Sequence, residues 1–284
     1  MGVRIIMDSA SDIRFDYAKE TGLGFAPLKT ILAGVEYRDG IDIQPDSFYG
    51  KLKANKELAS TSQVTVGEYS DLFAEAVSAG DEVVAITISG GLSGTYQSAS
   101  IAAADHPGKV FVVDSLSATA GEQVLLGHAL RMREAGAGAA EIFAALQELK
   151  KKIVLLVRVE TLEYLKRGGR VSKTAAFVGG MLHFMPILTL NAEGKLETVG
   201  KARGAKMSHK MVNDAIVARG GIDFSEPVCI TYAGDVNDGT VDAYLSDSEA
   251  IFGGKREQLS IGQLGCVIGT HTGPGAFVVA FVGK

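Results

Sequence analysis

The chain has 284 residues, of which 46% are hydrophobic, and a formal net charge of −5. This length and composition suit a compact protein of one large or two ordinary domains and argue against a disordered chain. The negative charge argues against a general nucleic-acid binder, and the longest apolar runs are too short to span a membrane.

The first half of the chain alternates between predicted strands and predicted helices. Apolar runs of strand length lie at residues 3–7, 83–88 and 110–113. Helices are predicted at residues 47–53, 66–78, 96–104, 121–133 and 139–150. Because apolar strands alternate with helices, we expect a parallel Rossmann-like sheet sandwiched by helices.

The second half mixes helices with hairpin-like strands. Strands are predicted at residues 153–157, 187–190, 196–199, 228–232, 266–268 and 277–282. Helices are predicted at residues 160–166 and 206–218 and around 237–245, whereas 251–260 carries little signal. We therefore expect a second α/β domain with a mixed sheet. The predicted boundary near Lys152 gives domains of residues 1–152 and 153–284, with a cleft between them.

A glycine-rich turn follows the strand at 83–88. The segment Ser89-Gly90-Gly91-Leu92-Ser93-Gly94-Thr95 leads directly into a predicted helix. The unpaired N–H groups at a helix N-terminus attract anions, and glycines allow a ligand to approach the backbone closely. The alternative is a tight turn in which Ser93 or Thr95 caps its own helix. Both interpretations stay open on this segment alone.

Other polar segments have two interpretations as well. Strand ends at Asp8-Ser9 and Asp114-Ser115 could share a ligand-binding rim with Ser93, or simply begin turns. Thr61-Ser62-Gln63 precedes a helix, so capping is the favoured interpretation and ligand contact the alternative. His271 lies among glycines, threonines and a proline, and either binds an anion or is satisfied by backbone.

The sequence lacks the common catalytic and cofactor motifs. There is no phosphate-binding P-loop, no dinucleotide fingerprint and no zinc-protease motif. A hydrolase nucleophile elbow would need glycine where Thr95 stands. Cys229 and Cys266 have neither metal-ligand spacing nor a disulfide framework, and no signal peptide is recognised. We expect a cytoplasmic protein without metal or cofactor.

The segment Phe177–Leu188 is rich in methionine, phenylalanine and glycine. Such residues line irregular apolar pockets, although an ordinary core is the simpler interpretation of this segment by itself. Beside an anion-binding turn, it suggests a ligand with a carboxylate head and a hydrocarbon tail.

Taken together, the segments resemble the DegV family of bacterial fatty-acid-binding proteins over nearly the whole chain. The resemblance rests on Asp8-Ser9-Ala10-Ser11-Asp12, Thr61-Ser62-Gln63, Ser89–Tyr96, Val113-Asp114-Ser115, Leu162–Ser172 and Gly269–Gly275. Val64 departs from the family pattern, in which proline often follows Thr-Ser-Gln.

The resemblance implies a two-domain α/β protein that encloses one long-chain fatty acid. Its N-terminal domain would carry the carboxylate-binding turns, and its C-terminal domain would form the acyl pocket. The carboxylate would be held by Thr61, Ser62, Ser93, Gly94 and His271. The acyl pocket would include Phe177, Met181, Phe184, Ile187 and Phe277.

The resemblance also implies a partner. The protein would have no catalytic activity of its own and would present the fatty acid to a separate fatty-acid kinase, which makes acyl phosphate. Arg170 and Arg203 would contact the phosphate or the partner. Transient contact with a membrane surface is expected, and nucleic-acid binding is not.

Two other functions compete with this one. An acyl or ester hydrolase would use Ser93 as nucleophile and His271 as base, which requires the two side chains within hydrogen-bond reach. A phosphate-ligand-binding module would use the same glycine-rich turn for a phosphate.

Overall fold

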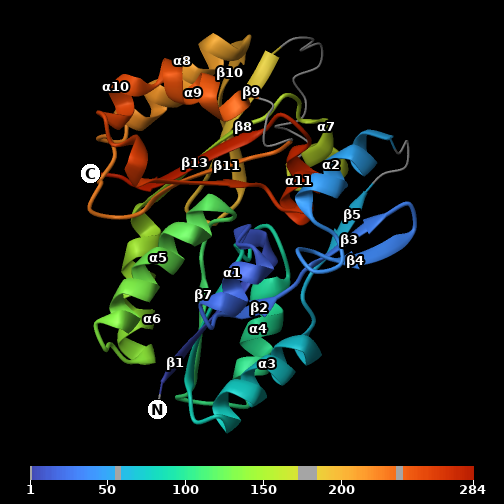
Figure 1. The fold of residues 1–284 in the computed structure, drawn as a ribbon, viewed down its shortest axis with the longest axis vertical. Coiled ribbons are helices and arrows are strands. Elements are labelled where there is room, and N and C mark those ends of the chain that lie inside the picture. The colour runs from blue at the N-terminus through green and yellow to red at the C-terminus, as the bar shows by residue number, and fades with distance from the viewer. Residues whose placement is uncertain (1, 55–58, 172–183, 235–238) are drawn as a thin grey trace.

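The computed structural model describes residues 2–54, 59–171, 184–234 and 239–284. Its N-terminal half is built on a four-stranded, all-parallel sheet (Figure 1). The strands, in spatial order, are β2 (Gly24–Ala26), β1 (Val3–Asp8), β6 (Glu82–Thr87) and β7 (Val110–Asp114). The helices are α1 (Phe15–Glu20), α2 (Pro45–Ala54), α3 (Val66–Ser78), α4 (Thr95–Ala103), α5 (Ala120–Glu134) and α6 (Ala139–Leu149).

Helices cover both faces of this sheet, as predicted. The pair α3 and α4 lies on one side and the pair α5 and α6 on the other (Figure 1). The strands run upward in that view, so their carboxyl ends face the C-terminal half (Figure 1). In open parallel sheets this edge is where ligands bind.

A small antiparallel sheet was not predicted. It has the order β4 (Val35–Arg38), β3 (Lys29–Leu32) and β5 (Ser60–Ser62). Because these strands have three or four residues each, they carry too little periodic pattern to be recognised. The favoured capping interpretation of Thr61 and Ser62 is wrong, since α3 is capped by Thr65 in a capping box with Glu68.

The C-terminal half contains the predicted mixed sheet. Its six strands have the order β10 (Leu196–Arg203), β9 (Phe184–Leu190), β8 (Ile153–Arg158), β13 (Phe277–Val282), β11 (Val228–Tyr232) and β12 (Leu259–Gln263). Only β11 and β12 pair in parallel. The helices are α7 (Glu163–Arg167), α8 (Ala205–Val217), α9 (Thr240–Asp247), α10 (Glu249–Phe252) and α11 (Cys266–Thr272). Short 3-10 helices are η1 (Ser9–Ser11), η2 (Lys150–Lys152) and η3 (Arg256–Gln258).

The predicted strand at 266–268 is wrong, because these residues begin helix α11. Their β-prone side chains are overridden by distant contacts. Carboxylates of Asp12 and Asp39 accept the N–H groups of Gly265 and Cys266, which stabilises a helical start at that point. Residues 251–260, which carried little signal, include the end of α10, η3 and the start of β12.

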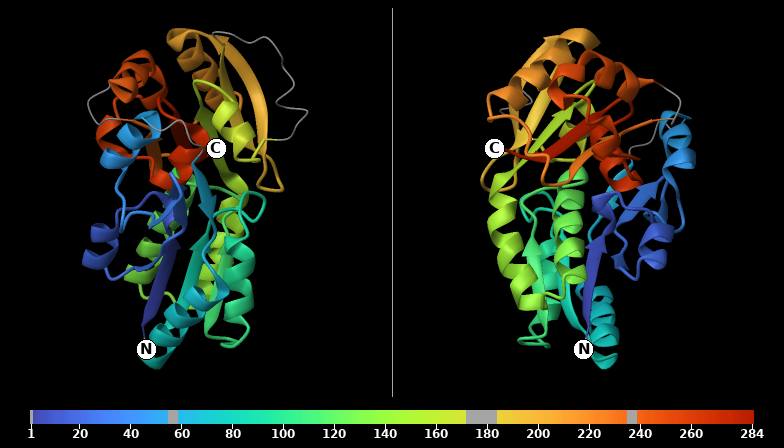
Figure 2. Two further views of the ribbon diagram at one scale, coloured as in Figure 1. Left: turned by 90° about the vertical axis from the view of Figure 1, so that its right-hand side faces the viewer. Right: turned by 60° about the vertical axis from the view of Figure 1, so that its left-hand side comes forward.

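Each face of the six-stranded sheet packs into a different hydrophobic core. Leu155, Val157 and Val278 point toward the N-terminal half and join its core. Their neighbours Leu156 and Val279 belong to a second core on the opposite face. In Figure 2, helices α8, α9 and α10 lie on the side of this sheet away from the parallel sheet. Successive residues of a strand thus serve different cores.

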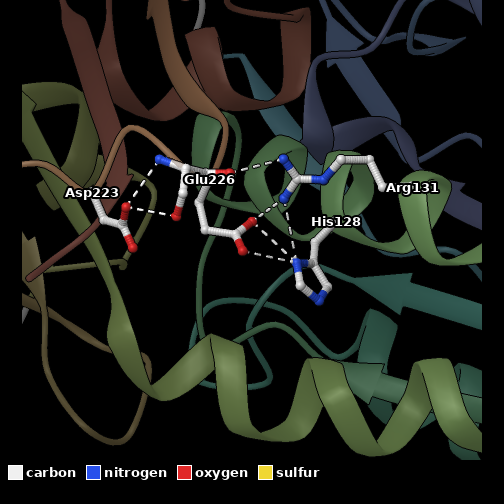
Figure 3. Close-up of polar contacts among 5 residues, drawn as sticks. His128, Arg131, Asp223 and Glu226 are labelled. Carbon is white, nitrogen blue, oxygen red and sulfur yellow. Dashed lines mark hydrogen bonds and ion pairs between the residues drawn. The ribbon is translucent and has the colours of Figure 1, made fainter.

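A polar cluster joins the two halves away from this interface core (Figure 3). Glu226, just before β11, lies between His128 and Arg131 of α5 and forms an ion pair with Arg131. The Nδ1 atom of His128 lies 3.0 Å from Glu226 Oε2. Arg131 also donates to the Ser225 carbonyl at 3.0 Å. Among the described residues, no helix is long and apolar enough to cross a membrane.

Candidate functional site

A cavity of about 270 Å³ lies between the parallel sheet and the six-stranded sheet. This volume is close to the lower end of the range for small-molecule sites, about 300–1,000 Å³. Its polar lining comes from Thr61, Ser62, Gln63, Ser93, Gly94, Thr119, Arg170, His271 and Thr272. Its apolar lining comes from Leu28, Ile88, Leu92, Ala118, Leu155, Val157, Leu165, Leu190, Leu196, Val267, Ile268 and Val278.

Six of these polar residues, which we call the polar end, line the same cavity. They are Thr61, Ser62, Ser93, Gly94, Arg170 and His271. Thr61 Oγ1 of β5 lies 2.8 Å from His271 Nε2 of α11. The structure thus brings together the five residues predicted to hold a carboxylate and adds Arg170 to them.

Gln63 connects β5 to the glycine-rich turn. Its Nε2 donates to Ser98 Oγ of α4 at 2.8 Å. Its side chain also lies on Gly94, where a Cβ atom would be 2.0 Å from Gln63 Oε1. A side chain at residue 94 would therefore displace the amide group of Gln63 from this position.

Most N–H groups of the glycine-rich turn are used within the protein. Gly90 donates to Asp114 Oδ1 and Gly91 to Ser89 Oγ, both at 3.1 Å. The N–H groups of Leu92 and Ser93 both bond to the Ser89 carbonyl. Among the described residues, nothing accepts the N–H of Gly94, the N-cap residue of α4. Within the turn, the N–H of Gly94 and the hydroxyl of Ser93 are therefore the groups that could meet an anion in the cavity, fewer than predicted.

Ser93 has a second contact that bears on its role. Its Oγ lies 2.9 Å from Thr95 Oγ1 and accepts the Thr95 N–H at 3.3 Å. The two interpretations of the turn are therefore compatible, because one hydroxyl oxygen lines the cavity and also accepts the N–H of Thr95, the first residue of α4.

Arg170 supplies the positive charge of the polar end. Its Nε donates to the Leu92 carbonyl at 3.2 Å, and its Nη1 donates to the Gly168 carbonyl. Half-burial lowers the pKa of this guanidinium, which nevertheless stays charged near neutral pH. Within the described part of the chain, no carboxylate pairs with it. Among the residues that the structure describes, a charged donor thus faces the cavity with no anion beside it.

His271 is neutral at physiological pH. Burial, assisted by the charge of Arg170, lowers the pKa of its imidazole to about 4. Its Nδ1 is buried and has no partner among the described residues, because the backbone of Gly168 lies against that side of the ring. Only Nε2, which faces Thr61, is engaged in a hydrogen bond.

A family model described as "Uncharacterised protein, DegV family" matches residues 2–284. The chain belongs to the DegV family. A DegV domain-containing protein from Caldanaerobacter subterraneus is 35% identical over 288 residues, covering 99% of both chains.

Two solved structures resemble this DegV protein throughout. One, described as fatty acid binding of a DegV family protein from Thermus thermophilus, is 34% identical with a TM-score of 0.87. It covers 99% of this chain and 100% of that one. The other, a DegV family protein from Eubacterium eligens loaded with heptadecanoic acid, is 25% identical with a TM-score of 0.83 and full coverage of both chains.

Three of the five predicted acyl-pocket residues, Phe184, Ile187 and Phe277, do not line this cavity. Ile187 and Phe277 are fully buried in the second core, and Phe277 stacks on Tyr244 with ring centroids 4.5 Å apart. Both point to the face of the sheet opposite the cavity, so the prediction chose the wrong face. Phe184 lines a separate surface pocket with Arg203. Phe177 and Met181 lie outside the described residues.

Residues that the sequence did not single out form the apolar wall. Leu155, Val157 and Val278 occupy alternate positions of β8 and β13, which were predicted as strands. Side chains of a strand point to alternate faces, so the sequence shows which residues share a face. Because both faces of these strands are apolar, it could not show which face borders the cavity.

The two predicted arginines also lie apart. Arg170 lines the cavity, whereas Arg203 is exposed at the end of β10, beside Lys206 and Lys210 in a surface pocket. The two arginines therefore lie at different places, Arg170 at the cavity and Arg203 at the surface.

The geometry gives no support to the hydrolase alternative. The hydroxyl of Ser93 meets Thr95, and His271 Nε2 meets Thr61, so no nucleophile–base pair is formed. Among the described residues, no group of histidine, cysteine or acidic side chains is arranged to hold a metal ion.

Proposed function

We propose that this DegV protein binds one long-chain fatty acid, with its carboxylate at the polar end and its hydrocarbon tail along the apolar wall. The single observation that carries the proposal is a cavity between two sheets in which Arg170 is the one charged residue of the described lining. Its similarity to the two fatty-acid-binding DegV structures supports the same function.

The polar end offers a carboxylate donors of different kinds. Arg170 supplies a charge-assisted donor, and Gly94 supplies a free N–H. We infer that His271 carries its proton on Nε2 and donates it to Thr61 Oγ1, because an unpartnered Nδ1 lone pair costs less than an unpartnered N–H. The Thr61 hydroxyl proton is then free to bond the carboxylate.

The tail supplies most of the binding energy in this proposal. Each buried methylene contributes roughly 0.8 kcal/mol, so a long chain exceeds what the head group alone provides. Leu155, Val157 and Val278 would contact this chain from one side and Leu28 and Ile88 from the other.

We further propose that the bound fatty acid is the substrate of a separate fatty-acid kinase, and that this protein has no catalysis or cofactor of its own. The resemblance of the sequence motifs supports this step. The exposed group of Arg203, Lys206 and Lys210 is suited to docking an acidic surface of the kinase or, transiently, a membrane surface.

Lipid analysis tests the first proposal. Protein purified under native conditions is denatured and extracted, and the extract is examined by mass spectrometry for fatty acids. We expect about one acyl chain per protein. Absence of acyl species, together with no uptake of added palmitate or oleate, would contradict fatty-acid binding.

Acyl phosphate formation tests the kinase step. Loaded protein is incubated with ATP and a bacterial fatty-acid kinase, and acyl phosphate is trapped with hydroxylamine. We expect Arg203→Ala to keep its fatty acid but to slow trapping at least tenfold. Equal rates for the variant and the wild type would remove Arg203 from the encounter.

A further inference from the structure

Helix α11 forms part of the cavity lining, but its N-cap residue makes no side-chain capping hydrogen bond. Val267, Ile268, His271 and Thr272 of this helix line the cavity. Its N-cap residue is Gly265, which has no side chain to accept the first N–H groups. Because His271 belongs to α11, the position of this helix determines the position of the imidazole.

Two carboxylates from the N-terminal half accept these N–H groups. Asp39 uses both oxygens: Oδ1 accepts from Cys266 at 3.0 Å and Oδ2 from Val267 at 3.4 Å. Asp12 uses one, since Oδ1 accepts from Gly265 at 2.8 Å. Asp12 Oδ2 has no partner among the described residues.

This arrangement is costlier than an ordinary cap. Asp39 is 2% exposed, and burial raises the pKa of both carboxyls. The nearby carboxylate of Asp39 also raises the pKa of Asp12. A serine or threonine at residue 265 would cap the helix without burying charges, but would not attach it to the N-terminal half.

The attachment is also tight. A Cβ atom on Gly265 would lie 2.9 Å from Asp12 Oδ1 and 3.3 Å from Asp39 Oδ2. Tyr49 adds a third tie from the same half, because its hydroxyl donates to the Leu264 carbonyl at 3.0 Å. At the other end of α11, His271 meets Thr61, which belongs to that half too.

We propose that Asp39 is a positioning residue of the carboxylate-binding site: with both oxygens it fixes α11 against the N-terminal half and thereby sets His271 against Thr61. The inference rests on the proposed function, which it deepens by naming a residue that acts on the head group without touching it.

The two aspartates provide a matched comparison. Asp12→Asn keeps an oxygen for Gly265, and its amide takes the place of the unpartnered Oδ2. Asp39→Asn must turn its amide N–H₂ toward the N–H of Cys266 or Val267, so one hydrogen bond becomes a clash between donors. Both variants replace a buried carboxyl group by an amide, and only the second loses a bond to α11. Asp46→Asn, exposed and bonded to Gln263, controls for contact across the same interface.

Binding of palmitate and of hexadecan-1-ol is measured for each variant by calorimetry. We expect Asp39→Asn to raise the Kd for palmitate about tenfold, with Asp12→Asn and Asp46→Asn within about twofold of wild type. The Kd for the alcohol, which has the same tail and no charge, should stay within about twofold in all three. Equal losses for Asp39→Asn and Asp12→Asn, or equal losses for palmitate and the alcohol, would overturn the proposal.

A second readout needs no ligand. In the ligand-free protein, the ¹⁵N signals of the His271 imidazole and the hydrogen exchange of the Cys266 and Val267 amides report the placement of α11. We expect Asp39→Asn to shift the imidazole signals and speed the exchange, and Asp12→Asn to do neither. If wild-type protein binds no fatty acid, the proposed function fails while this readout still decides the role of Asp39.

Should Asp39→Asn fail to fold, Gly265→Ala replaces it. Its methyl group displaces the Asp12 carboxylate and the start of α11, so the same loss for palmitate and the same shift of the imidazole are expected. Wild-type behaviour of Gly265→Ala would contradict the proposal.

Discussion

At the scale of single residues, the polar end divides into one permanent charge and several neutral donors. Arg170 keeps its charge at any physiological pH, whereas Thr61, Ser93, Gly94 and His271 are neutral. A carboxylate bound here therefore pairs with one cation and completes its hydrogen bonds with uncharged groups, as buried anions require.

Arg170→Gln tests this division. The glutamine keeps hydrogen-bonding capacity toward Leu92 but removes the charge. We expect palmitate affinity to fall by about 2–3 kcal/mol, since a charged hydrogen bond in a half-buried site is lost. The affinity for hexadecan-1-ol should not change. Lys166→Gln, which changes an exposed residue of the nearby helix α7, is the control. Retained palmitate affinity in Arg170→Gln would place the carboxylate elsewhere.

His271 gives a prediction about pH. Its pKa is lowered to about 4 from an ordinary value of 6.5, so the unfolded chain takes up a proton that the folded protein does not. The stability that this group contributes is present above pH 6.5 and is lost as the pH falls toward 4. The imidazole should titrate near pH 4 by NMR, and the variant His271→Gln should lose less stability than wild type over this interval.

Asp8 acts in the opposite direction and must be separated from this effect. Burial raises the pKa of its carboxyl to about 7, so its contribution is present below pH 3.8 and is lost as the pH rises toward 7. Because the two effects oppose each other, the pH dependence of wild-type stability alone does not isolate His271. The difference in stability between wild type and His271→Gln does. Parallel curves for the two proteins would contradict the lowered pKa.

At the scale of elements, the faces of β8 and β13 decide what the cavity accepts. Val278 borders the cavity, and Val279 packs into the second core one residue later. We expect Val278→Phe to fill part of the cavity, so that the preferred acyl chain becomes shorter with little change in stability. Competition between laurate and palmitate measures the preference.

Val279→Phe is the matched control on the same strand. Its added ring must enter a packed core, which costs about 1–3 kcal/mol of unfolding free energy and leaves chain-length preference unchanged. If both variants lose stability alike and neither changes the preference, the assignment of the two faces is wrong.

The elements also show what could be read from the sequence. The long helices and most strands of the two large sheets were predicted, because their apolar patterns are local, whereas β2 and β12 were not predicted and β9 and β10 were predicted only in part. Helix α11 was missed, because its start depends on Asp39, 227 residues away. The wall residues of β8 and β13 were missed for another reason, since two apolar faces give no contrast.

The polar end was predicted differently from the wall. Thr61, Ser93 and His271 were named together through the family resemblance, since no local pattern relates residues so far apart. The resemblance could not show that Arg170 lines the cavity while Arg203 faces solvent. That distinction depends on how the segment after α7 crosses the glycine-rich turn.

At the scale of the whole molecule, the proposed ligand lies between two halves that each have their own sheet. The bound fatty acid would therefore contact both halves and stabilise the interface between them. At a fatty-acid concentration 100 times Kd, mass action adds about 2.7 kcal/mol to the free energy of unfolding. For a chain of this size, we expect a rise in Tm of about 5–10 °C.

Delipidated protein melted with and without palmitate checks this expectation. Methyl palmitate, which has no carboxylate, is the control and should produce a smaller rise. An unchanged Tm at saturating palmitate would show that the acid does not bind the folded state preferentially.

The separation of polar end and apolar wall has a consequence for the history of the family. The proposed donors for the head group lie on β5, the glycine-rich turn, α11 and the segment after α7, while β8, β9 and β13 supply much of the apolar lining proposed for the tail. Exchanges of strand side chains can thus alter which lipids a descendant accepts without disturbing the chemistry at the carboxylate. Preference for an acyl chain and recognition of the carboxylate can therefore change independently within one fold.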